Sequence, residues 1–295
     1  MFPANRTISF AAVLFALSLG PLSSPAFSQA EFSGQWGQEI HEDEPERRPG
    51  PEIGDYTGLP INDAARMKAD SWDPQKWEMI EHECEAMPAD YAARAPGDIR
   101  VTPEVDRFTQ GIIAWHSTVR IWLQERMIYM DGRPHPTRHA AHTWQGFSTG
   151  EWEADMLKVK TTHLKEGWLK RNGLPRSVNA TLTEYFIRHG NYLTLVTNIE
   201  DPAYLTEPLI RSSNWILAPG DRLLPNYCLP SVHVSHPKGW VAHYLPGENK
   251  WLNEFAYKWG IPVEAVRGGA ETMYPEYQEK LAKMPLPPTP SAEKK

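Results

Sequence analysis

The middle of the chain alternates between apolar and polar positions, with the period of two that is typical of half-buried β-strands. The alternation starts near Asp98 and predicts strands at residues 108–118, 119–131, 150–162, 181–188, 192–200, 209–217 and 226–234. Turn sequences rather than helices separate most of these segments. We therefore expect a mainly antiparallel sheet that closes into a barrel or folds into a sandwich.

Both flanks of this region have different patterns. Residues 32–36 are predicted to form a first short strand. Residues 61–85 have helical spacing, with Asn62 or Asp63 as the N-cap and an interruption at Asp73-Pro74. Helical spacing returns after residue 248, at Trp251, Leu252, Phe255 and Trp259, and again over residues 275–284. The predicted organisation is a loop and helix segment (31–97), a β-barrel domain (98–247), C-terminal helices (248–284) and a disordered tail (285–295).

The first thirty residues resemble a secretory signal peptide. A single charge at Arg6 precedes a short apolar core at residues 8–19, and Ser28-Gln29-Ala30 supplies the small residues of a cleavage site. A membrane anchor is the alternative, but a spanning helix needs roughly 20 apolar residues, and Gly20 and Pro21 interrupt this run. We expect cleavage after Ala30 or nearby, and a periplasmic or secreted protein.

The formal net charge of −7 and the absence of a basic cluster argue against nucleic acid as a partner, and against membrane binding once the leader is removed. The two cysteines, Cys84 and Cys228, are expected to form a disulfide in an oxidising compartment. The alternative is a pair of buried thiols. The oligomeric state is left open by the sequence.

Several motifs in the middle of the chain point to a known family. They are Arg126-Met127-Ile128-Tyr129-Met130-Asp131-Gly132-Arg133-Pro134-His135-Pro136, the segment from Trp144-Gln145-Gly146 to Asp155-Met156-Leu157, Arg171-Asn172-Gly173-Leu174-Pro175-Arg176-Ser177, Leu182-Thr183-Glu184 and Glu200-Asp201-Pro202. On these residues, the stretch from about Arg107 to Cys228 resembles a large, mostly uncharacterised family of secreted bacterial proteins. The resemblance implies a lipocalin-like β-barrel and export, and it implies no general activity.

The chain departs from the family pattern in two places. It has Gly146-Phe147-Ser148 where the family usually has Gly-His-Ser, and Glu153-Ala154-Asp155 where the family usually has Glu-Gly-Asp. No role of the missing histidine can therefore be carried over to this chain.

Three ionisable residues are predicted on the apolar faces of strands. By alternation, His116 shares a face with Ile112 and Ala114, His163 with Leu157, Val159 and Thr161, and Glu184 with Leu182 and Phe186. A charged group on such a face must be paired or have a shifted pKa. His116, His163 and Glu184 are therefore candidate acid–base groups inside a barrel, with a structural hydrogen bond as the alternative for each.

Two further sets of residues are candidates for binding. Tyr129, Arg133, Trp115, Trp144 and Trp152 are candidate ligand contacts, and Trp122 and Trp168 are spread through the same region; ordinary packing is the alternative. His135, His139 and His142 could hold a metal such as zinc, completed by Asp131 or Glu153. Pro134 and Pro136 argue against the helical turn that would bring the histidines together.

We expect an exported protein that handles a small molecule. The first hypothesis is a lyase, isomerase or hydrolase that acts on a cyclic or aromatic, partly apolar substrate without an organic cofactor. The second is a non-catalytic carrier of an apolar ligand. An envelope scaffold is a third possibility. The chain has no Gly-x-Ser-x-Gly, phosphate-loop, His-Glu-x-x-His or Cys-x-x-Cys motif.

Overall fold

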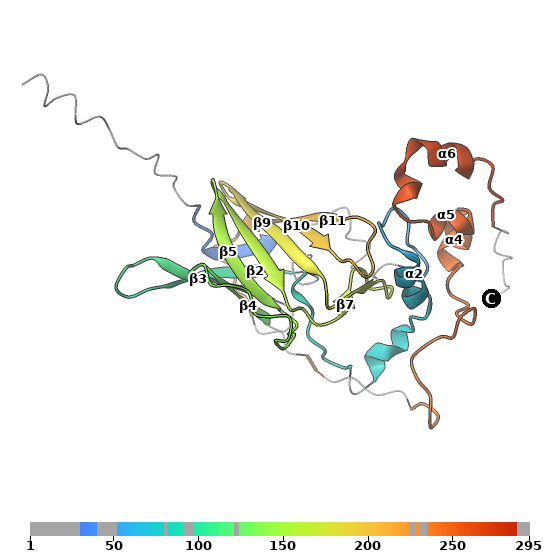
Figure 1. The fold of residues 1–295 in the computed structure, drawn as a ribbon, viewed down its shortest axis with the longest axis horizontal. Coiled ribbons are helices and arrows are strands. Elements are labelled where there is room, and N and C mark those ends of the chain that lie inside the picture. Colours follow the sequence, from blue (N-terminus) through green and yellow to red (C-terminus); the bar gives the residue numbers. More distant parts are fainter. Residues whose placement is uncertain are drawn as a thin grey trace, which may run out of the picture.

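Nine strands form a closed barrel in the computed structural model, and the helices gather beyond one end of it (Figure 1). The structure describes residues 30–39, 52–79, 82–90, 97–120, 124–224, 228–229 and 235–287. Residues 1–29 of the predicted leader, most of the predicted strand 226–234 and most of the predicted tail lie outside these ranges. The prediction of a mainly β barrel with helical segments outside it is confirmed.

Strand β1 closes the barrel, because it pairs with β11 on one side and β2 on the other. It comes from upstream of the predicted barrel range 98–247. The strand order is β1-β11-β10-β9-β6-β5-β4-β3-β2. The bounds are β1 Gly34–Gln38, β2 Ile99–Val105, β3 Ile112–Val119, β4 Gln124–Tyr129, β5 Phe147–Glu153, β6 Met156–Thr162, β9 Thr181–His189, β10 Tyr192–Glu200 and β11 Leu209–Leu217. Strands β7 (Gly167–Trp168) and β8 (Pro175–Arg176) form a separate small ribbon.

Two details of the barrel differ from the prediction. The predicted strand 150–162 is a hairpin, since β5 and β6 turn at Ala154-Asp155. Strands β4 and β5 pair in parallel, through Ile128 with Ser148 and Tyr129 with Thr149, whereas the other neighbouring barrel strands are antiparallel. The parallel pair arises because the segment between β4 and β5 carries the chain back before β5 begins.

Inward-pointing side chains fill the barrel with one apolar cluster. Its buried members are Phe32, Trp36, Ile99, Val101, Trp115, Val119, Ile128, Leu157, Val159, Phe186, Leu193, Leu195 and Trp215. A second cluster continues the core past the barrel, toward the N-terminal helix. It contains Tyr56, Leu59, Ile61, Ala65, Ala69, Ala89, Leu164, Leu169, Leu174, Leu182, Ile199, Leu205 and Leu209. The core thus joins the barrel to the segment that precedes it.

The predicted helix 61–85 is two shorter elements, α2 (Asp63–Asp70) and the 3-10 helix η2 (Pro74–Glu78). The Asn62 side chain caps α2 by accepting from the backbone N–H of Ala65. Asp73 caps η2 in the same way, at the interruption that the sequence predicted. The C-terminal elements are α4 (Glu254–Trp259), α5 (Val263–Val266), η4 (Ala270–Met273) and α6 (Pro275–Leu281).

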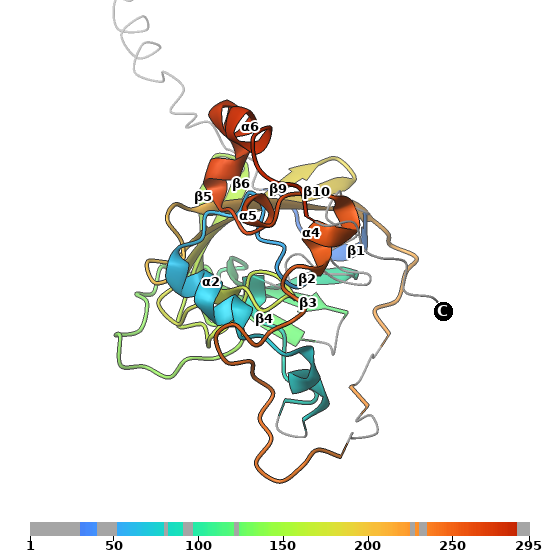
Figure 2. The same cartoon turned by 90° about the vertical axis from the view of Figure 1, so that its right-hand side faces the viewer.

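The N-terminal and C-terminal helical segments pack against each other (Figure 2). The carboxylate of Asp70 accepts from the hydroxyl of Tyr56, at 2.9 Å, and pairs with Arg267. Burial raises the pKa of Tyr56 above its ordinary range, with a further contribution from Asp70, so its hydroxyl stays protonated. The side chain of Asn249 donates to the backbone oxygens of Asp70 and Trp72. These contacts explain why segments far apart in sequence lie side by side.

A disulfide joins Cys84 to Cys228, with their Cα atoms 5.5 Å apart. The predicted pairing is confirmed, and a disulfide is compatible with an oxidising extracellular compartment. None of the helices within the described ranges has the length and apolar character needed to cross a membrane.

Candidate functional site

The barrel interior has little free space. The cavity bordered by Ser117, Arg126 and Gln145 on one side and by Phe186 and Trp215 on the other has a volume of about 20 Å³. A water molecule needs about 10–15 Å³ by this measure. This cavity, in the interior where the acid–base hypothesis placed the substrate, therefore has room for about one water molecule.

Glu184 lies in this interior, as its alternation predicted, and it is fully buried. Its carboxylate pairs with the guanidinium of Arg126 through both terminal nitrogens, one of them at 3.0 Å. Arg126 also donates to the hydroxyls of Ser148 at 3.0 Å and Thr161 at 3.1 Å. Every charge in the group has a partner, so Glu184 stands in a structural ion pair, the alternative that the sequence had left open.

His116 lies on the outer face of the barrel. Its Nδ1 lies 2.9 Å from Glu125 and its Nε2 lies 3.1 Å from Glu104. Burial by itself lowers the pKa of His116, but the hydrogen bonds to Glu125 and Glu104 outweigh it and raise the pKa above its ordinary value. Ala114 shares the face of His116, as its alternation predicted, and this face points away from the barrel interior. Ile112 does not share it, because the register of β2 and β3 shifts between Ala114 and Ile112 and Ile112 packs against the core.

His163 follows the end of β6 and belongs to a chain of hydrogen bonds on the outer face. Its Nε2 lies 2.9 Å from the carbonyl oxygen of Thr137, which can only accept, so this nitrogen donates. The hydroxyl of Thr162 lies 2.7 Å from His163 Nδ1 and 2.8 Å from His135 Nδ1, and so links the two rings. The hydroxyl of Thr149 completes the chain, 2.9 Å from His135 Nε2.

Of the two histidines in this chain of hydrogen bonds, His135 favours the neutral form. Burial, then the charge of Lys160 and the proximity of His163, lower the pKa of His135. The three predicted acid–base residues thus have different partners and three separate environments: Glu184 inside the barrel, His116 between two glutamates, and His163 among threonines.

The predicted metal ligands do not converge. His135 contacts threonines, His142 Nδ1 donates to the carbonyl oxygen of Leu164, and His139 accepts from Arg138. Within the described part of the chain, no group of three or more His, Cys, Asp or Glu side chains has a geometry that could hold a metal ion.

Most of the predicted ligand contacts pack against other parts of the barrel. Trp115 is buried in the core, and Trp152 stacks on Phe32 with ring centroids 5.7 Å apart. Arg133 lies 3.8 Å above the ring of Tyr129 and pairs with Asp131, on the outside. Trp144 is different, because it borders a cleft at the end of the barrel. Trp122 lies outside the described residues.

We call this cleft, of about 600 Å³, the tryptophan cleft. Its volume falls within the range of about 300–1,000 Å³ that small-molecule sites occupy. It lies where the barrel-end loops meet α2 and η2. Its walls are formed by Lys68, Ser71, Trp72, Lys76, Glu85, Trp144, Lys165, Glu166, Gly167, Trp168, Gly173, Pro175, Ala242 and His243.

Indole rings form much of the wall. The rings of Trp72 and Trp168 meet edge to face with centroids 5.8 Å apart, and Trp77 lies 4.8 Å from Trp168. Gly173 makes the position of Trp72 possible. Its φ is +88°, and a Cβ atom there would lie 2.3 Å from the Cβ of Trp72.

Lysines surround the indoles. The ammonium of Lys76 lies 5.8 Å from the ring centroids of both Trp72 and Trp168, and that of Lys165 lies 5.2 Å from Trp144. Lys68 pairs with Glu166, and burial lowers the pKa of Lys68. Across the described residues, no carboxylate lies within ion-pair distance of Lys76 or Lys165.

Two buried polar atoms beside the cleft lack hydrogen bonds within the described structure. They are the indole nitrogen of Trp72, a residue only 8% exposed, and the Oε2 atom of Glu85. His82 lies 3.4 Å from that oxygen but forms no hydrogen bond with it. Leaving a buried polar atom unpaired costs about 1–3 kcal/mol, so a ligand that paired either atom would gain from it.

Buried ion pairs and caps hold the loops that form the cleft. Arg176, which is fully buried, pairs with Asp90 at 3.1 Å and donates to the backbone oxygen of Lys165 at 2.8 Å. The carboxylate of Asp201 accepts from both the backbone N–H and the hydroxyl of Ser177. Two of the sequence motifs, 171–177 and 200–202, therefore contain residues that fix the wall of the cleft.

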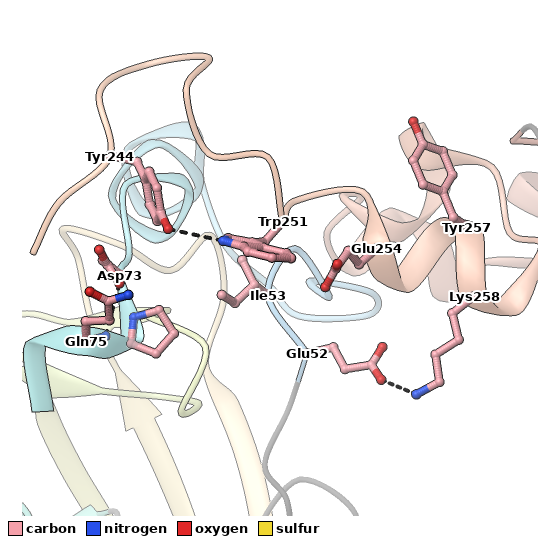
Figure 3. A pocket seen from close by; sticks show the side chains of 10 residues that line it. Glu52, Ile53, Asp73, Gln75, Tyr244, Trp251, Glu254, Tyr257 and Lys258 are labelled. Carbon is pink, nitrogen blue, oxygen red and sulfur yellow. Dashed lines mark hydrogen bonds and ion pairs between the residues drawn. The ribbon is translucent and has the colours of Figure 1, made fainter. Parts of the chain in front are cut away.

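A wider groove of about 990 Å³ lies between the N-terminal and C-terminal segments (Figure 3). We call it the C-terminal groove; it is lined by Glu52, Ile53, Asp73, Pro74, Gln75, Tyr244, Trp251, Glu254, Tyr257 and Lys258. Several of its polar groups are already paired. The indole of Trp251 donates to the hydroxyl of Tyr244 at 3.1 Å, and Glu52 pairs with Lys258.

Comparison of the chain with protein-family models, curated proteins and solved structures finds no match. Of the residues around the cleft, the sequence pointed to Trp144 and Trp168, and it missed Trp72, Lys76 and Lys165. A lysine lies within four residues of several tryptophans, at Lys68 and Trp72, Lys76 and Trp77, and Lys165 and Trp168. This spacing of lysines and tryptophans is the sequence pattern that could have indicated the residues of the cleft.

Proposed function

We propose that this protein is exported and binds a small molecule, and that its ligand occupies the tryptophan cleft rather than the barrel interior. The observation that carries the proposal is the combination of a cleft of about 600 Å³ with indole walls and two lysines, Lys76 and Lys165, that have no carboxylate partner among the described residues. Sites of this kind combine an apolar wall with a few polar groups that orient the ligand.

Binding is favoured over acid–base catalysis because the three candidate catalytic residues have separate partners. Glu184 is neutralised by Arg126, and His116 is held by glutamates on the outer face. The cleft is also favoured over the C-terminal groove, in which Trp251 and Lys258 already have partners.

Export is proposed from the pattern of the first thirty residues and from the resemblance to secreted bacterial barrel proteins. The disulfide between Cys84 and Cys228 supports it. The test is N-terminal sequencing of the protein from a periplasmic fraction. The proposal expects a chain that begins at or near Glu31, and an intact Met1 in the cytoplasmic fraction would contradict it.

The binding proposal is tested by ligand capture. Purified protein is equilibrated with a small-molecule extract and separated by gel filtration, and the bound compounds are released and weighed by mass spectrometry. The native protein should enrich at least one compound, and Trp168→Ala should lose it. Trp259→Ala is the matched control, because Trp259 is exposed on α4, next to Lys258 and away from the cleft.

Capture that is equal in the native protein and Trp168→Ala would contradict the cleft as the site. The same experiment separates a carrier from a lyase or a hydrolase. A carrier returns the compound with its mass unchanged, whereas a lyase or hydrolase returns a product of different mass.

A further inference from the structure

The side chains that line the tryptophan cleft indicate what kind of molecule it could bind, because they combine indole rings with two lysines that have no carboxylate partner among the described residues. We propose that the cleft selects a cyclic hydroxy acid: a single ring with a carboxylate at one position and a hydroxyl at another. This inference rests on the proposed function of the cleft.

The indole rings of the cleft favour a ligand that contains a ring. Trp72 and Trp168 stand edge to face, and Trp144 forms another part of the wall. Flat apolar surfaces of this kind bind the face of an aromatic ring or the C–H face of a sugar ring. A volume of about 600 Å³ accommodates a compound of one or two rings.

The lysines of the cleft favour a ligand with a negative charge. Three lysines and two glutamates line the cleft, and only Lys68 among those lysines pairs with a carboxylate of the described residues. The remaining two, Lys76 and Lys165, form a local excess of positive charge on a chain whose net charge is −7. A carboxylate can accept charge-assisted hydrogen bonds from these ammonium groups, whereas a cationic ligand would be repelled.

The two unpaired polar atoms beside the cleft favour a hydroxyl group on the ligand. The indole nitrogen of Trp72 needs an acceptor, and Oε2 of Glu85 needs a donor. A hydroxyl can both donate and accept, so it can pair with either group. A carboxylate alone could serve Trp72 but would be repelled by Glu85.

The test compares probes of equal shape by isothermal titration calorimetry on the full mature chain. The aromatic pair is para-hydroxybenzoate and its neutral analogue para-hydroxybenzamide, and the saccharide pair is D-glucuronate and D-glucose. In at least one pair, the acid should bind on the order of tenfold more tightly than the neutral compound, as expected for hydrogen bonds to charged groups. The preferred pair identifies the ring as aromatic or saccharide.

Lys76→Met and Lys165→Met should each reduce the affinity for the acid toward that for the neutral analogue, and leave the neutral analogue unchanged. Lys250→Met is the matched control, because Lys250 also lies beside a tryptophan, Trp251, but outside the cleft. Circular dichroism and the melting temperature check that each variant is folded.

Equal binding of the acid and the neutral compound in both pairs would overturn the inference and leave the proposed function intact. The same holds if the acid is preferred but neither lysine variant weakens it. Failure of the proposed function has a different signature, since no compound would then be captured from the extract and no probe of either pair would bind.

Discussion

Ala154 stands at a position where the backbone favours glycine. It occupies the turn between β5 and β6 with φ +58°, in the left-handed region, and it is exposed. A residue with a side chain costs about 1–2 kcal/mol in this conformation. Ala154→Gly should therefore raise the free energy of unfolding by about 0.5–1 kcal/mol, after allowing for the greater freedom of glycine in the unfolded chain. Urea denaturation measures the change.

Ala64→Gly is the control, because Ala64 is also exposed but lies within α2. The same chemical change should there lower stability by up to about 1 kcal/mol. Two changes of the same sign would show that the left-handed turn contributes nothing measurable.

The pair between Arg126 and Glu184 predicts a second residue-level effect. Glu184→Gln leaves the buried guanidinium without its countercharge, which should lower the free energy of unfolding by about 3–5 kcal/mol. The double variant Arg126→Met/Glu184→Leu should recover most of that loss, since the hydroxyls of Ser148 and Thr161 still bond to each other at 2.9 Å. Both values come from chemical denaturation. A single variant as stable as the native protein would mean that the pair is not the structural group described above.

At the scale of elements, the sequence predicted best where the strand partners are neighbours in the chain. The hairpin of β9 and β10 and the strand β11 match the predicted segments closely. The β5–β6 hairpin was missed because its turn has Ala154 rather than a glycine to mark it. Alternation placed Glu184 inside the barrel, but it could not supply Arg126, which comes from β4, a strand that is not next to β9 in the sheet.

The face of a strand is also decided by its partners. His116 has the right alternation for a buried residue, yet β3 turns that face outward toward Glu104 and Glu125. The alternation of side chains along a strand determines which residues share a face. Only the pairing of the strands in the closed sheet determines which of the two faces points into the barrel.

Two histidines on the outer face of the barrel should make opposite contributions to the pH dependence of stability. The pKa of His116 is raised above 6.5 in the folded protein, so its contribution to stability is full below that pH and is lost as pH rises through the folded pKa. The pKa of His135 is lowered below 6.5, so its contribution is present above that pH and is lost as pH falls through the folded pKa.

His116→Gln should therefore destabilise the protein more at low pH than at high pH, and His135→Gln should do the reverse. Urea denaturation of the two variants and the native protein, from about one pH unit below to one unit above the ordinary histidine pKa, measures both slopes. Each variant serves as the control for the other. Slopes of the same sign would contradict the assigned environments.

At the scale of the whole molecule, the tryptophan cleft belongs to no single element. Its walls come from α2 and η2, from the barrel-end loops around Trp144 and Trp168, and from the C-terminal segment at His243. Local patterns cannot predict such a site, because the contacts that assemble it, such as the bridge between Trp72 and His243, join residues far apart in sequence.

The disulfide also joins parts of the chain that are far apart in sequence. Cys84 immediately precedes Glu85, which lines the cleft, and its partner Cys228 is 144 residues away. Closing so long a loop restricts the unfolded chain, and the chain-entropy model assigns it about 5 kcal/mol at most. The double variant Cys84→Ser/Cys228→Ser should therefore be less stable by about 2–5 kcal/mol in denaturant.

The double variant should also bind ligand more weakly, because the wall that carries Glu85 loses its covalent tether. Native protein with a reducing agent should match the double variant in both stability and affinity, and adding the reducing agent to the variant should change nothing. If reduction lowered stability but left affinity unchanged, the tether would stabilise the fold without shaping the cleft. The position of Glu85 would then have to be maintained by its noncovalent contacts, among them the approach of His82 to its carboxylate.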